Sequence, residues 1–142
     1  MSDKSSDLYT ENIMDHFRRP RNKQKIKNPI VEHEETNLSC GDEISVQLEI
    51  EDGVIKKIGW GGTGCAISQA GTSILSEEIE GKKTDEVMSL GKEDVYKLLG
   101  VPVGPRRIKC ALLCLHTIKN ALRKSEGHSL QGWLDTVEID ED

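Results

Sequence analysis

The chain has 142 residues, a net charge of −6, a hydrophobic fraction of 35% and a charged fraction of 31%. The acidic charge argues against non-specific nucleic-acid binding, and no apolar stretch approaches the ~20 residues that cross a membrane. We expect residues 1–142 to form a single domain with flexible polar ends at 1–7 and 138–142. The start of the chain shows no secretory signal, so we expect a cytoplasmic protein with reduced cysteines.

The first half of the chain carries one helical pattern and then three strand patterns. Apolar residues at helical spacing between Leu8 and Phe17 predict a helix, and Pro20 ends it. The clearest strand signal is the strict alternation of apolar and polar residues before the turn signal Asp52-Gly53. The predicted strands cover 30–36, 44–50 and 54–60.

The second half of the chain is predicted to be helical. Apolar residues recur there at helical spacing in two long segments and two short ones, which are 65–79, 84–90, 92–99 and 108–122. Strands followed by helices are typical of an α+β fold. We therefore predict a three-stranded antiparallel sheet with helices packed on one face.

Three cysteines and one aspartate stand where the chain is expected to bend or to begin a helix. Cys40 and Asp42 are separated by one glycine, Cys65 follows a glycine-rich loop, and Cys110 lies in the first turn of the last long helix. Free N–H groups at a helix N-terminus favour the thiolate, which is the form that binds metal and attacks sulfur. Three thiolates and a carboxylate suit zinc or iron.

The spacing of these residues is by itself a weak signal. Gaps of 25 and 45 residues match no short zinc-finger pattern, and a free cysteine often only fills space in a core. Simple packing suits Cys114, which lies in the middle of a predicted helix. It suits Cys40 and Cys65 poorly, because both lie in glycine-containing loops. No ligand geometry can be argued for the four histidines, which are His16, His33, His116 and His128.

Four segments around these residues occur together in one order. They are Asp15-His16-Phe17-Arg18-Arg19-Pro20-Arg21-Asn22, Asn37-Leu38-Ser39-Cys40-Gly41-Asp42, Gly64-Cys65-Ala66-Ile67-Ser68-Gln69-Ala70 and Arg106-Arg107-Ile108-Lys109-Cys110-Ala111-Leu112-Leu113. With these segments, the chain resembles the IscU/SufU/NifU-type iron–sulfur cluster assembly scaffold family from about residue 8 to 124.

The resemblance implies a site, a cargo and partners. The ligands would be Cys40, Asp42, Cys65 and Cys110, and they would hold a transient [2Fe–2S] cluster or zinc. Sulfur would arrive as a persulfide from a cysteine desulfurase, and the cluster would pass to apo iron–sulfur acceptor proteins. The resemblance thus predicts an assembly scaffold without nucleic-acid or membrane partners.

The two main subgroups imply different roles. An IscU-type scaffold accepts sulfur on Cys110 and is not an enzyme. A SufU-type protein is a zinc-dependent sulfurtransferase that accepts sulfur on Cys40 and stimulates its desulfurase. Lys109 stands where IscU proteins carry a histidine, which favours SufU; the gap between Cys65 and Cys110 lacks the SufU insertion, which favours IscU. The sequence slightly favours the scaffold.

Overall fold

The structure of the chain is a computed structural model that describes residues 4–139, with side chains from residue 11 onward. The elements in this part of the chain are α1 (Lys4–Arg18), β1 (Val31–Asn37), β2 (Asp42–Glu51), β3 (Val54–Thr63), α2 (Ala66–Ile79), α3 (Thr84–Met88), α4 (Lys92–Leu99), the 3-10 turn η1 (Pro105–Arg107), α5 (Ile108–Ser125) and α6 (Trp133–Val137). None of these helices is long and apolar enough to cross a membrane.

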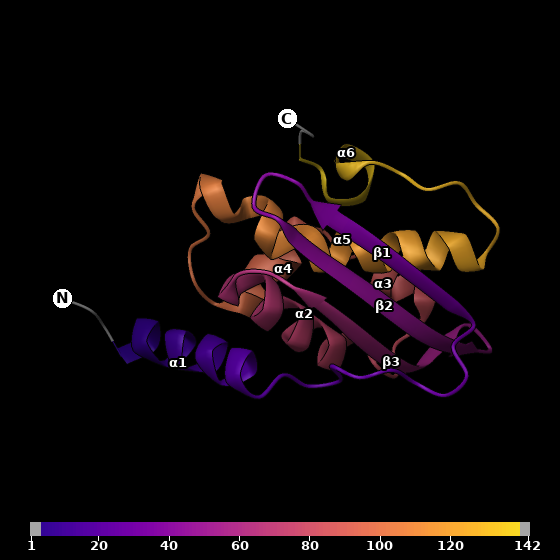
Figure 1. Cartoon of the computed structure of the whole chain (residues 1–142), viewed down its shortest axis with the longest axis horizontal. Coiled ribbons are helices and arrows are strands. Elements are labelled where there is room, and N and C mark those ends of the chain that lie inside the picture. The colour runs from indigo at the N-terminus through magenta and orange to yellow at the C-terminus, as the bar shows by residue number, and fades with distance from the viewer. Residues whose placement is uncertain (1–3, 140–142) are drawn as a thin grey trace.

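The three strands form one antiparallel sheet in the order β1-β2-β3, and α2 and α5 pack on one of its faces, as Figure 1 shows. The alternation in β2 turns Ile44, Val46 and Leu48 towards these helices, where all three are fully buried. Leu112, Leu115 and other aliphatic residues of α5 complete the core. The predicted α+β fold, with its helices on one face of a three-stranded sheet, is confirmed.

Several predicted boundaries differ from the structure. The polar residues 4–7 belong to α1, and β3 continues through Gly61 and Gly62, which were expected in a loop. The short helix α6 was not predicted; its Val137 is fully buried, and Lys92 Nζ donates to the Glu138 carbonyl at 3.2 Å. Positions 138–139 are therefore not a loose end. The expected flexible residues 1–3 and 140–142 lie outside the described part.

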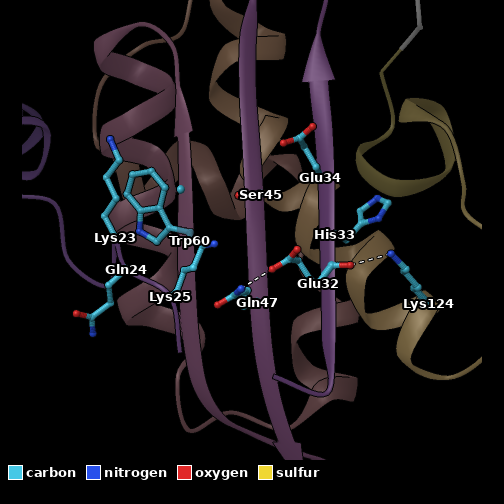
Figure 2. Close-up of a pocket in the computed structure, with 11 residues that line it drawn as sticks. Lys23, Gln24, Lys25, Glu32, His33, Glu34, Ser45, Gln47, Trp60 and Lys124 are labelled. Atoms are coloured by element: carbon cyan, nitrogen blue, oxygen red, sulfur yellow. Dashed lines mark hydrogen bonds between the residues drawn. The ribbon is translucent and has the colours of Figure 1, made fainter. Parts of the chain in front are cut away.

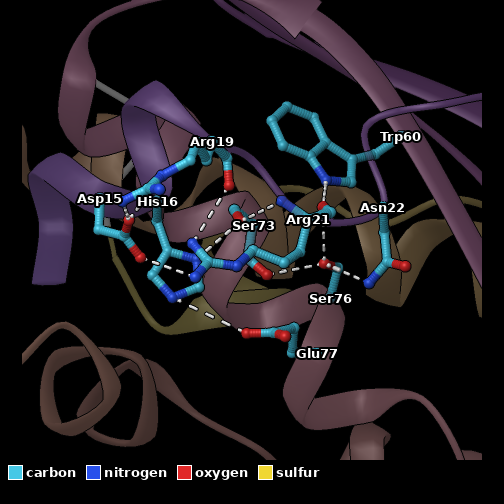
Figure 3. A network of polar contacts seen from close by, with 9 residues as sticks. All are labelled: Asp15, His16, Arg19, Arg21, Asn22, Trp60, Ser73, Ser76 and Glu77. Atoms are coloured by element: carbon cyan, nitrogen blue, oxygen red, sulfur yellow. Dashed lines mark hydrogen bonds and ion pairs between the residues drawn. The ribbon is translucent and has the colours of Figure 1, made fainter.

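A polar network attaches α1 to α2 (Figure 3). His16 is buried, and its Nδ1 lies 2.7 Å from the Ser73 hydroxyl, which also accepts a hydrogen bond from the Arg21 amide at 2.8 Å. Asp15 forms ion pairs with Arg19 and Arg21, both at 2.7 Å. These contacts give the first sequence segment a structural role.

The other face of the sheet is open and polar (Figure 2). Gln47 in β2 donates to the Glu32 carboxylate, and Lys124 at the end of α5 donates to the Glu32 carbonyl at 2.8 Å. This second contact occupies a backbone acceptor on the outer edge of β1, which would otherwise be free to pair with another strand.

Candidate metal and sulfur site

Three groups from distant parts of the chain converge where the sheet meets the start of α5. Cys40 lies in the turn between β1 and β2, Asp42 is the first residue of β2, and Cys110 lies in the first turn of α5. The two sulfurs and one carboxylate oxygen all lie within 4.8 Å of one another. Ligands around a tetrahedral zinc ion at ~2.3 Å stand ~3.8 Å apart, so a small contraction would bring this set to metal-binding geometry.

Cys65 joins the site through its backbone. It is the residue before the first turn of α2, and its amide donates to Asp42 Oδ1 at 3.0 Å. A Cβ at position 64 would lie 2.5 Å from the same carboxylate oxygen, so glycine is needed there. Among the described residues, the cluster of candidate ligand atoms contains Cys40, Asp42 and Cys110, with the half-buried Cys65 sulfur outside it.

Asn37 is a part of the site whose role sequence reasoning missed. Its side chain is buried, and its amide donates to Asp42 Oδ2 at 3.3 Å and to Cys110 Sγ at 3.7 Å. One amide thus holds the carboxylate and the thiol together. The only sequence signal was its place in the segment that carries Cys40, since a buried asparagine at a strand end leaves no periodic pattern.

The electrostatics of Cys110 differ from the sequence prediction. Burial raises the pKa of its thiol, and its contacts with Asp42 and Cys40 and the nearby Cys65 act in the same direction. The helix N-terminus was expected to favour the thiolate, but Cys110 is only 1% exposed and its sulfur lies beside other acidic groups. A bound cation would reverse this preference, because it stabilises the charged ligands.

Arg107 supplies the positive charge that the sequence placed next to Cys110. A hydrogen bond to Cys110, reinforced by the negative charges of Cys65, Cys110 and Cys40, raises the pKa of the guanidinium above its ordinary value. The guanidinium therefore lies close to the three sulfurs and places a positive charge beside them.

Solvent reaches the site on the side of Cys40. The Cys40 side chain is exposed and lines a hollow of about 530 Å³, bordered by Arg106, Ile108 and Ile139 among others. Cys114, by contrast, is buried in the core, and burial raises the pKa of its thiol to about 12. As predicted for Cys114, the side chain packs in the hydrophobic core.

The lysine next to Cys110 extends towards the C-terminal segment. Lys109 Nζ lies 5.7 Å from the centre of the Trp133 ring, which in turn stacks on His116 with 4.2 Å between ring centres. Among the described residues, no histidine belongs to the cluster of candidate ligands.

Sequence reasoning also missed a buried network beside this stack. The Glu35 carboxylate lies 2.7 Å from His33 Nε2 and 3.5 Å from His116 Nε2, and it accepts a hydrogen bond from Asn120 at 2.8 Å. Burial raises the pKa of Glu35, but the hydrogen bonds from His116, His33 and Asn120 outweigh it and lower the pKa to about 2. His116 and Asn120 of α5 thus hold that helix to β1 through the Glu35 carboxylate.

Comparison with known proteins gives this geometry a family context. The sequence profile described as the NifU-like N terminal domain matches residues 8–131, which is most of the chain. The chain belongs to this family. All of the residues that form the candidate site lie within the matched NifU-like region.

Relatives and solved structures agree with that assignment. The chain is 37% identical over 133 residues to the Iron-sulfur cluster assembly scaffold protein IscU of Thermotoga maritima, with 82% of this chain and 94% of the relative covered. It is 33% identical over 137 residues to the Zinc-dependent sulfurtransferase SufU of Bacillus subtilis, with 84% and 92% covered. A crystal structure of a scaffold protein for the SUF system from Fervidobacterium islandicum superposes with a TM-score of 0.70 at 32% identity and covers 83% of this chain and 98% of that one.

Proposed function

We propose that this protein is an iron–sulfur cluster assembly scaffold that accepts persulfide sulfur from a cysteine desulfurase and assembles a [2Fe–2S] cluster for transfer to apo-proteins. One observation carries the proposal: Cys40, Asp42 and Cys110 converge within 4.8 Å beside Cys65, in a NifU-like chain. Relatives named as scaffolds match at least four fifths of the chain and support the same function.

The proposed ligands of the cluster are Cys40, Asp42, Cys65 and Cys110. Thiolates are the usual ligands of iron–sulfur clusters, and a single carboxylate among them binds iron less tightly than a fourth thiolate would. Such a mixed set suits a cargo that must be released again. Asn37 and Arg107 have positioning roles, since they hold the carboxylate and the sulfurs through hydrogen bonds.

We assign the first sulfur to Cys40, because it is exposed to the hollow at the mouth of the site while Cys110 is buried. The Cys40 thiolate attacks the outer sulfur of the desulfurase persulfide and forms a new S–S bond. The old S–S bond breaks, its electron pair leaves with the desulfurase cysteine as a thiolate, and Cys40 carries the persulfide. Arg106 at the same hollow adds positive charge where this anionic donor enters.

A second function has its own support. A zinc-dependent sulfurtransferase needs the same thiol exchange at Cys40 but keeps zinc on the four ligands, and no cluster is built. The observation in its favour is that the described cluster of Cys40, Asp42 and Cys110 contains no histidine, together with Lys109, which extends over Trp133. The similarity to the Bacillus subtilis protein of that name points the same way.

Anaerobic reconstitution tests the scaffold function. The protein is incubated with a cysteine desulfurase, cysteine and iron(II), and a cluster that builds on it gives visible charge-transfer absorption. We expect the absorption in the wild type and in Cys114→Ala, and its loss in Cys40→Ala, Cys65→Ala and Cys110→Ala. Colour that survives in all three ligand variants would refute the assigned site.

Metal analysis of the anaerobically purified protein separates the two functions. One zinc per chain, no cluster after reconstitution and strong stimulation of the desulfurase would establish the sulfurtransferase instead of the scaffold. The variant Asp42→Ala tests the carboxylate ligand: it should change metal affinity and cluster lifetime without unfolding the chain. Values equal to those of the wild type would remove Asp42 from the ligand set.

A further inference from the structure

Positive charge is concentrated in the segment that joins α1 to β1. Residues 16–31 contain six lysines and arginines and no aspartate or glutamate, although the whole chain has a net charge of −6. Arg19 and Arg21 are paired with Asp15, and Lys23 donates to Gln69 at 2.8 Å. Arg19, Arg21 and Lys23 therefore have polar partners, and the lysines that follow them need a separate explanation.

The backbone of this segment is held firmly against the sheet. The Asn22 carbonyl accepts a hydrogen bond from the Trp60 amide at 3.0 Å, and the Ile26 amide donates to Gln47 Oε1 at 2.8 Å. Between these two points the Gln24 carbonyl lies directly on Gly59, where any Cβ would overlap with it. The segment thus presents its side chains from a fixed backbone and not from a mobile loop.

Four lysines surround a hollow of about 470 Å³ beside β3, and we call this surface the lysine hollow. Two of them come from the clamped segment and two from β3: Lys25, Lys27, Lys56 and Lys57. None has an ion pair or a hydrogen bond with any side chain that the structure describes. Glu80 is the one acidic residue at the hollow.

We propose that the lysine hollow is a docking site for an acidic segment of another protein. Unpaired lysines on a rigid, concave surface favour an anionic partner, because no existing ion pair has to be broken and little backbone order has to be gained on binding. The inference does not depend on the chemistry of the cysteine site.

The position of the lysine hollow suits a tethering contact. Lys56 and Lys57 lie next to the β2–β3 hairpin, at the opposite end of the sheet from the turn that carries Cys40 (Figure 1). Lys25 lies beside β3, next to the open face of the sheet (Figure 2). A partner held there would leave the mouth of the cysteine site free for a sulfur donor or a cluster acceptor.

A protein segment fits the hollow better than nucleic acid does. Binding to a phosphate backbone needs an extended row of cations, and the net charge of −6 opposes it over the rest of the surface. Glu80 at the hollow, and Glu49 opposite Lys57 in the β2–β3 ladder, add repulsion against a continuous line of phosphates. A short peptide can place its carboxylates between these acidic groups.

Fluorescence anisotropy with a labelled peptide of alternating glutamate and serine tests the proposal at low ionic strength. We expect saturable binding to the wild type, a loss of about tenfold in affinity in K25E/K57E, and a steep decrease with added salt. The single variant Lys57→Glu has a matched control in Lys97→Glu, which makes the same charge change on the exposed side of α4. Gly59→Ala should also weaken binding, because it displaces the clamped segment without changing any charge.

Three results would overturn the proposal. The wild type fails to bind the peptide, or Lys57→Glu and Lys97→Glu weaken binding equally, or a single-stranded oligonucleotide of the same charge binds more tightly than the peptide. Circular dichroism and metal content, measured on each variant, show that the fold and the cysteine site are intact. Reconstitution of a cluster in K25E/K57E should equal that of the wild type, so the two proposals can fail separately.

Discussion

Gly64→Ala tests how the start of α2 is connected to the site. A Cβ at position 64 would lie 2.5 Å from Asp42 Oδ1, where an ordinary contact needs about 3.4 Å. Asp42 is only 1% exposed, so its carboxylate has little room to turn away. The added methyl group therefore has to push the carboxylate and the start of α2 apart by roughly 0.9 Å.

This displacement is large enough to break the contact between the two parts of the site. The Cys65 amide donates to Asp42 Oδ1 at 3.0 Å, and a shift of this size takes the pair beyond hydrogen-bonding distance. Loss of a hydrogen bond to a charged group costs about 1.5–3 kcal/mol. Loss of a contact that orients a metal ligand weakens metal affinity by about 10–100-fold.

Zinc affinity, measured by competition with a chromophoric chelator, is the deciding assay. Gly64 has a φ of 158°, so alanine also strains the backbone, and stability alone would not distinguish the two effects. The matched control is Gly61→Ala, since a Cβ there meets only Ser45 Oγ at an ordinary 3.6 Å. A Gly64→Ala protein that binds zinc as tightly as Gly61→Ala and the wild type would refute the reasoning.

Three further changes test other parts of the molecule. Cys114→Ala should lower the free energy of unfolding by about 1 kcal/mol in urea titrations and leave zinc affinity unchanged; a loss of zinc affinity would make Cys114 part of the site. Ser73→Ala removes the acceptor of the Arg21 amide and should cost about 1–3 kcal/mol, with faster hydrogen exchange at that amide; unchanged exchange would contradict the network. Glu35 has a pKa of about 2 against an ordinary 4.5, so its stabilising contribution of about 2–3 kcal/mol is complete above pH 4.5 and is lost as the pH falls towards 2. In Glu35→Gln, acid unfolding followed by circular dichroism should be less steep over that interval, and an unchanged slope would exclude Glu35.

Elements with strong local patterns could be predicted from the sequence. The alternation in β2, the Asp52-Gly53 turn and the helical spacing of α4 gave nearly the observed bounds. The convergence of Cys40, Asp42 and Cys110 was predicted because these residues lie in a loop or at the start of a helix, and because the chain resembles a known family. Their spacing in the sequence was by itself only a weak signal.

The missed features depend on contacts between distant residues. Asn37 contacts Cys110, which lies 73 positions further along the chain, and Glu35 is held by His116 and Asn120 of a helix that begins far along the chain. A single buried amide or carboxylate leaves no periodic signal, so sequence reasoning had no means of assigning it a partner. The raised pKa of Cys110 was missed for a similar reason, because burial and neighbouring acids depend on packing.

The four candidate ligands differ in their exposure, and this difference bears on function. Cys110 is buried, Asp42 is buried, Cys65 is half-buried, and Cys40 is exposed. A structural zinc site surrounds its metal with protein, because its only task is to stabilise the fold. Here the buried side, held by Asn37 and the Cys65 amide, fixes the geometry, while the side of Cys40 stays open to a partner. Sulfur transfer and cluster release both need an exposed ligand on a rigid base, so the exposure of Cys40 favours an exchanging site over a structural one.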